Sequence, residues 1–174
     1  MTEAILIRPR EYSLITGIPD DLLRLWRSRG KLFLGNCAPN RMTTYDIVDV
    51  VKGTIIYRFL DVTKGEIDAA LRVSAACEHR LPTALNRAAV GDTEFIRISV
   101  PLDAGSAHPF LELSIDLGEV CRFALHRAAL QMMDCPPLDR IDASGRFKRF
   151  EHSEIAYRRA VSGLMAACRL RDAA

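Results

Sequence analysis

The sequence lacks the features that would place it in a membrane or outside the cell. Its 174 residues contain no apolar run near the roughly 18 residues that a membrane-spanning helix needs. The N-terminus has an early acidic residue and no long apolar segment, so we expect no secretion signal and a cytoplasmic protein without a membrane partner. Hydrophobic residues make up 49% and charged residues 26% of the chain, which is typical of a globular protein.

Recognisable metal and catalytic motifs are also absent. The five cysteines are scattered and form no Cys-x-x-Cys pair, so we expect reduced, mostly buried thiols rather than a disulfide framework or a zinc knuckle. Cys77 and His79 are close enough to suggest a metal pair, but two ligands do not make a site. There is no Gly-x-Ser-x-Gly, phosphate loop or His-Glu-x-x-His. We therefore expect no enzymatic activity, no bound metal and no cofactor.

Charge is only weakly asymmetric along the chain. The net charge of +2 is too small to indicate a polyanionic partner by itself. Residues 1–64 nevertheless carry ten lysines and arginines against seven acidic residues, whereas the remainder is close to neutral. The basic excess directs attention to the N-terminal segment.

The first predicted helix lies in this basic segment. Pro9 suits the first turn of a helix that runs to about Thr16, and Gly17 suits its end because glycine adopts left-handed geometry easily. Leu14 and Ile15 are predicted to face inward from this helix.

A second helix is predicted from Asp20, whose carboxylate suits a first turn, to Gly30. Leu22, Leu25 and Trp26 are spaced three and four apart and should share one face. The opposite side or its edges then carry Arg24, Arg27 and Arg29. Two short helices joined through a glycine are typical of a helix-turn-helix, although a solvated surface helix with a few arginines is the alternative.

The segment after the second helix indicates a winged variant of this motif. Turn-forming residues between 33 and 40 predict a hairpin tip, from which Arg41 returns. Thr44 suits the N-cap of a helix over residues 47–55. The isoleucines and valines there favour a strand by propensity alone, but their spacing is helical.

The C-terminal part alternates between strand and helix patterns. Its predicted elements are, in order, a helix opened by a Thr63-x-x-Glu66 capping box and reaching about Cys77, strands near 94–100 and 111–115, a helix over 117–132 capped by Asp116-x-x-Glu119, and a helix from about 152 to 170. The two strands could pair as an antiparallel hairpin. Such a pair needs cover from helices, a third strand or another subunit.

The N-terminal residues resemble a known family. Gly17-Ile18, Leu23-Arg24, Trp26 and Gly30 stand where MerR-type winged helix-turn-helix domains show Gly-Val, Leu-Arg, an aromatic residue and glycine. The helix after the wing matches as well, and the resemblance covers roughly residues 10–71. Excisionases and the small terminase subunits of phages are similar in the same places.

These patterns predict an α+β fold with three segments. Residues 1–72 should form a MerR-like winged helix-turn-helix, residues 73–90 a helical connector, and residues 91–174 a small α+β module for dimerisation or sensing. The expected partner is double-stranded DNA, bound by a sequence-specific transcriptional regulator that acts as a homodimer. The alternative is a phage- or mobile-element-type architectural or DNA-packaging protein.

The predicted DNA contacts divide by position. Arg24 and Arg27 are the candidates for base edges or phosphates, and Arg29, Lys31 and Arg41 are the candidates for the DNA backbone. Two roles remain open for the C-terminal module: it could recruit a protein partner, or it could bind a small-molecule effector.

Overall fold

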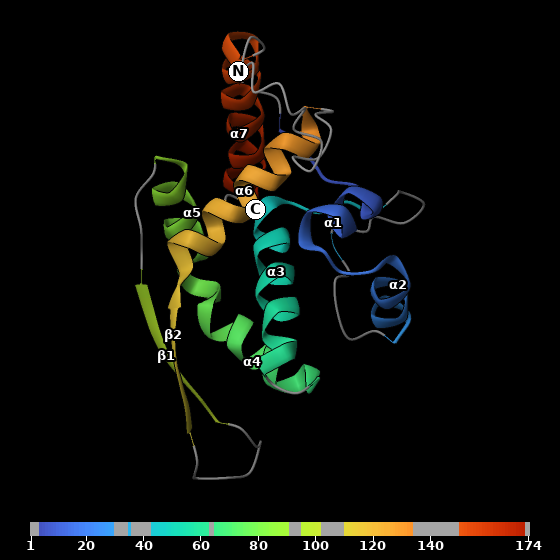
Figure 1. The fold of residues 1–174 in the computed structure, drawn as a ribbon, viewed down its shortest axis with the longest axis vertical. Helices are drawn as coiled ribbons and strands as arrows, with labels where there is room; N and C mark the ends of the chain where they lie inside the picture. Colours follow the sequence, from blue (N-terminus) through green and yellow to red (C-terminus); the bar gives the residue numbers. More distant parts are fainter. Residues whose placement is uncertain are drawn as a thin grey trace, which may run out of the picture.

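The structure, a computed structural model, describes residues 4–29, 35, 43–62, 65–90, 95–101, 110–133 and 150–172. The elements within these ranges are α1 (Pro9–Thr16), α2 (Asp20–Ser28), α3 (Ile47–Val62), α4 (Ile67–Cys77), the short 3-10 helix η1 (Glu78–Arg80), α5 (Leu81–Ala89), β1 (Phe95–Pro101), β2 (Phe110–Asp116), α6 (Leu117–Met132) and α7 (Phe150–Asp172) (Figure 1).

The central helix of the described fold is α3. It contacts α1, α4 and α6 extensively and also reaches α5 and α7 (Figure 1). Its buried residues are Ile47, Val48, Val50, Val51, Gly53, Thr54, Ile55 and Ile56. A helix surrounded by other helices needs apolar residues around most of its circumference. Burial therefore outweighs the weak helix propensity of isoleucine and valine, and the predicted helix is confirmed.

The cap of α3 differs from the prediction. Asp46 Oδ1 accepts a hydrogen bond from the Asp49 N–H at 2.9 Å, and Asp49 Oδ2 accepts one from the Asp46 N–H at 3.1 Å. These reciprocal bonds form a capping box, so the prediction of Thr44 as the cap is wrong. The physical reason is that the chain is still extended at Tyr45, which exchanges two backbone hydrogen bonds of 2.8 Å with Ile7.

In the described core, α1 crosses α3 closely at Gly53. Tyr12 is fully buried, its ring lies 4.2 Å from that of Tyr45 between centroids, and its hydroxyl donates to the Asp49 carbonyl at 3.1 Å. A Cβ added to Gly53 would lie 1.9 Å from Tyr12 Oη. Burial, followed by the nearby Asp49 and Tyr45, raises the pKa of Tyr12 well above its ordinary value, so its hydroxyl stays protonated.

The inward faces of α1 and α2 agree with the prediction only in part. Ile15 and Trp26 are buried as predicted, whereas Leu14 is 51% and Leu25 is 41% exposed, so the prediction for these two leucines is wrong. In α1 the residues that face inward with Ile15 include Tyr12, which packs on α3. In α2 the inward residues are Leu23 and Trp26, which are three residues apart and share a face.

Each helix and strand predicted for the C-terminal part is present. β1 and β2 pair antiparallel, with Phe95 opposite Asp116 and Pro101 opposite Phe110. The Asp116 side chain accepts from the Glu119 N–H at 2.8 Å and caps α6 as predicted. α4 is also present, but it begins after Glu66 rather than before it. The Thr63 half of that predicted capping box lies outside the described residues.

The α+β assignment is wrong, because the described chain is mostly helical. The only sheet in the described ranges is the β1–β2 hairpin, and it packs on α4 and α6 instead of forming a layer with a core of its own. α6 in turn packs on α1, α3, α5 and α7. One buried cluster consequently runs from Ile7 to Cys168 and joins helices from both ends of the chain.

Replacing Gly53 with alanine should lower the free energy of unfolding by about 1–3 kcal/mol, because overpacking against Tyr12 outweighs the gain in helix propensity. Urea unfolding would measure the change. In a Tyr12→Ala background the same Gly53→Ala substitution should become neutral or stabilising, since the obstructing ring is gone. A Gly53→Ala variant more stable than the parent chain would contradict this packing.

Candidate nucleic-acid interface

The turn between α1 and α2 is fixed by local hydrogen bonds. Gly17 has a φ of 80°, and its N–H donates to the Ser13 carbonyl at 2.9 Å. The Ser13 hydroxyl donates to the Ile18 carbonyl at 2.6 Å, and Thr16 Oγ1 accepts from the Ile18 N–H at 3.3 Å. Ile18 is fully buried. The direction in which α2 leaves α1 is therefore determined by several bonds within six residues, and the predicted left-handed glycine is confirmed.

α2 lies at the outer edge of the molecule, beside α1 (Figure 1). Leu23 and Trp26 face inward and attach it to the core. The exposed residues of α2 and the position after it are Asp20, Asp21, Arg24, Leu25, Ser28 and Arg29. The helix thus presents a polar, charged surface to solvent.

The predicted contact residues fall into three groups. Arg24 and Arg29 are exposed. Arg27 is half-buried, and its Nη2 donates to Thr43 Oγ1 at 2.6 Å. Lys31 and Arg41 lie outside the described residues. Sequence reasoning missed the role of Thr43, which is 16 residues from Arg27 and carries no local signal of the contact.

The Arg27–Thr43 bond attaches α2 to the segment that leads into α3. Thr43 is buried, so the bond is partly shielded from water. A hydrogen bond from a charged donor to a shielded acceptor is stronger than an exposed one. Arg27 therefore supports the position of α2, and the exposed charge is carried by Arg24 and Arg29.

Charge is separated along α2. Asp20 and Asp21 occupy the first turn, where the N–H groups of the helix favour carboxylates. Arg24 lies one turn further along, and Arg27 and Arg29 lie at the C-terminal end. An anionic ligand would be repelled at the first turn and attracted by the second half of the helix.

A distant arginine also supports the two helices. Arg127 of α6 donates from Nη2 to the Leu14 carbonyl at 2.7 Å, in the last turn of α1. Carbonyls in a last turn lack intrahelical partners and carry partial negative charge, so a guanidinium stabilises them. Arg127 and Arg58 also lie over the Phe123 ring, at 5.4 and 4.3 Å from its centroid. α6 is thereby attached directly to α1.

The described residues offer little support for a metal site. Cys77, Cys121 and Cys168 are buried thiols, which confirms the prediction for these three. Burial raises the pKa of Cys77 to about 11, so its thiol is protonated near neutral pH, whereas metals bind the thiolate. His79 is exposed, and within the described ranges no three His, Cys, Asp or Glu side chains are grouped to hold a metal ion.

Replacing Gly17 with alanine should lower the free energy of unfolding by about 1 kcal/mol, because alanine adopts a φ near 80° at a cost. The added Cβ would lie 3.7 Å from Tyr57 Cε1, an ordinary contact, so the cost comes from the backbone alone. Gly17→Asn should cost less, since asparagine tolerates this conformation. Urea unfolding of both variants is the measurement. Wild-type stability in Gly17→Ala would refute the assigned turn geometry.

Arg27→Ala should reduce the free energy of unfolding by about 1–2 kcal/mol, because the variant loses a charged hydrogen bond to Thr43. Arg24→Ala is the matched control on the same helix and should change it by less than about 0.5 kcal/mol, since Arg24 is exposed. Thermal or urea unfolding would compare the two. Equal losses would show that Arg27 has no special structural role.

None of the described helices has the length and apolar character needed to cross a membrane. Comparisons of the chain with models of known protein families, with curated proteins and with solved structures give no match. The function proposed for the chain therefore depends on the geometry and charges of α1 and α2.

Proposed function

We propose that the chain binds double-stranded DNA through α2 and acts as a sequence-specific transcriptional regulator in homodimeric form. The observation that carries this proposal is the helix-turn-helix: α1 ends at Thr16, the left-handed Gly17 turns the chain, and α2 begins at Asp20 at the edge of the molecule. In proteins with this motif the second helix lies in the major groove while the first crosses the DNA backbone. The MerR-type spacing of the N-terminal residues supports the same function.

Each arginine of α2 has a distinct proposed role. Arg24 is exposed in the middle of the helix and would contact a base edge, where its planar fork suits the two acceptors of guanine. Arg29 is exposed at the end of α2 and would contact phosphate. Arg27 would add a contact only with the N–H groups that Thr43 leaves available. Lys31 and Arg41 remain proposed backbone contacts.

The charge of α2 supports the proposed homodimer. A helix with Asp20 and Asp21 in its first turn and few exposed arginines makes a small number of phosphate contacts. Affinity for DNA at physiological salt depends strongly on that number. Two copies on two half-sites would double the contacts, and their spacing would follow the helical repeat of DNA.

The test is selection of bound sequences from a randomised duplex pool, followed by fluorescence anisotropy with the enriched duplex. Selection should yield paired half-sites. Arg24→Ala should weaken binding by about 1–3 kcal/mol, because a base contact is lost. Arg159→Ala is the matched control, since Arg159 is an exposed arginine on α7, outside the helix-turn-helix. Its effect should be small at the same ionic strength.

Two results would overturn the proposal. If no sequence is enriched, the chain is not a sequence-specific DNA-binding protein. If Arg24→Ala and Arg159→Ala bind the enriched duplex equally well, α2 is not the reading helix. A ring-like oligomer on a single site would instead favour the DNA-packaging alternative over the dimeric regulator.

A further inference from the structure

Arg24 and Leu25 lie side by side on the exposed face of α2. Successive residues of an α-helix are rotated by about 100° around its axis, so Asp21 and Ser28 fall on nearly one line. Arg24 and Leu25 then lie about 50° to either side of this line. All four residues are exposed, whereas Leu23 attaches the opposite side of the helix to the core. Leu25 is therefore as central to the exposed face as Arg24.

Leu25 is the apolar exception on this face. Among the exposed residues that the structure describes in α2, every other one is charged or is a serine, whereas Leu25 is 41% exposed. The Ser28 hydroxyl donates to the Leu25 carbonyl at 2.9 Å, so its hydrogen is directed to the backbone rather than outward. A guanidinium that donates hydrogen bonds and an isobutyl group that makes only apolar contacts consequently stand next to each other.

The major groove of DNA offers groups that match this pair. Guanine presents two acceptors there, O6 and N7, and thymine presents a methyl group at C5. The planar fork of an arginine suits the two acceptors, and an apolar side chain packs on the methyl group. Both groups belong to base edges rather than to phosphates, so contacts with them carry sequence information. The exposed face of α2 is therefore complementary to a guanine next to a thymine.

We propose that Leu25 is a specificity-determining residue that packs on the 5-methyl group of a thymine next to the guanine contacted by Arg24. This inference rests on the proposed binding of DNA by α2 and adds a second base to the sequence that the helix reads. Removal of the methyl group from water favours thymine over a base without that group. Arg24 thus selects guanine through hydrogen bonds, and Leu25 selects thymine through burial of apolar surface.

The test uses the duplex enriched by selection and a set of duplexes in which one thymine at a time is replaced by deoxyuridine. Deoxyuridine keeps the hydrogen-bonding groups of thymine and lacks only the 5-methyl group. Fluorescence anisotropy should show a roughly fourfold loss of affinity at the thymine beside the guanine, as expected when one methyl group is no longer buried. Leu25→Ala should bind the thymine and deoxyuridine duplexes within about twofold of each other, because its side chain no longer reaches the methyl group.

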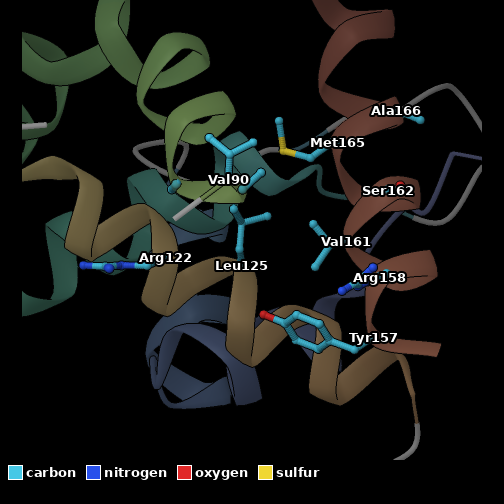
Figure 2. A pocket seen from close by; sticks show the side chains of 11 residues that line it. Val90, Arg122, Leu125, Tyr157, Arg158, Val161, Ser162, Met165 and Ala166 are labelled. Atoms are coloured by element: carbon cyan, nitrogen blue, oxygen red, sulfur yellow. The ribbon is translucent and has the colours of Figure 1, made fainter. Parts of the chain in front are cut away.

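Leu14→Ala and Val90→Ala are the matched controls. Leu14 is 51% exposed on α1, and Val90, the residue after α5, is 82% exposed. Val90 lines a pocket of about 610 Å³ where α5, α6 and α7 meet, whose described lining includes no residue of α1 or α2 (Figure 2). Figure 1 shows α5 and α2 at opposite edges of the molecule. Both controls should therefore keep the roughly fourfold difference between thymine and deoxyuridine.

Arg24→Ala separates failure of this inference from failure of the proposed function. This variant should bind the enriched duplex more weakly and still prefer thymine to deoxyuridine roughly fourfold, since Leu25 is intact. Circular dichroism would verify that all four variants fold, which the exposed positions of the replaced side chains favour.

Two results would overturn the inference while the proposed function stands. The first is a set of enriched half-sites that have no thymine next to the guanine. The second is a loss of affinity at deoxyuridine that is the same in Leu25→Ala as in the parent chain. In both cases Arg24→Ala still weakens binding. If no sequence is enriched, or if Arg24→Ala binds as tightly as the parent chain, the proposed function itself fails and the inference fails with it.

Discussion

The contact of Tyr12 with Gly53 is the constraint on which the position of the N-terminal helices depends. Because Gly53 has no side chain, the Tyr12 hydroxyl reaches the backbone of α3 and donates to the Asp49 carbonyl at 3.1 Å. Asp49 also belongs to the capping box that begins α3, and Tyr45, which stacks on Tyr12, pairs with Ile7. The Tyr12 ring therefore links three features of the fold: the placement of α1, the first turn of α3 and the pairing of the N-terminal segment. A change there would alter all three together.

α2 depends on this arrangement at both of its ends. Its beginning follows from the hydrogen-bonded turn at Gly17, and its end is attached through Arg27 to Thr43, two residues before Tyr45. α6 adds a third support, since Arg127 donates to the last turn of α1. The helix proposed to read DNA is thus oriented by contacts that also stabilise the core. A substitution at Arg27 would change both DNA binding and the free energy of unfolding, whereas one at Arg24 would change DNA binding alone.

Local patterns in the sequence predicted the helices and strands more accurately than they predicted how these elements pack together. The Gly17 turn, the Asp116 cap and the span of α6 depend on neighbouring residues, and all are confirmed. Which of two adjacent apolar residues faces inward depends on the helix opposite, so Leu14 is exposed against expectation. The α+β prediction failed for the same reason, because strands that are correct locally join a core made by helices distant in sequence. The bond from Arg127 spans 113 residues, and no spacing rule indicates it.

The acidic first turn of α2 bears on how the helix would read DNA. Asp20 and Arg24 are four residues apart, and Asp21 and Arg24 three, so a carboxylate lies next to the proposed reading arginine on the exposed surface. Such a carboxylate reduces the general attraction of phosphate, which is the sequence-independent part of affinity. The Arg24 guanidinium still suits the two acceptors on the edge of a guanine. A carboxylate can itself accept a hydrogen bond from the amino group of a cytosine. A proposed regulator with a net charge of only +2 would then bind unmatched DNA weakly, so base contacts would carry more of the difference between matched and unmatched sites.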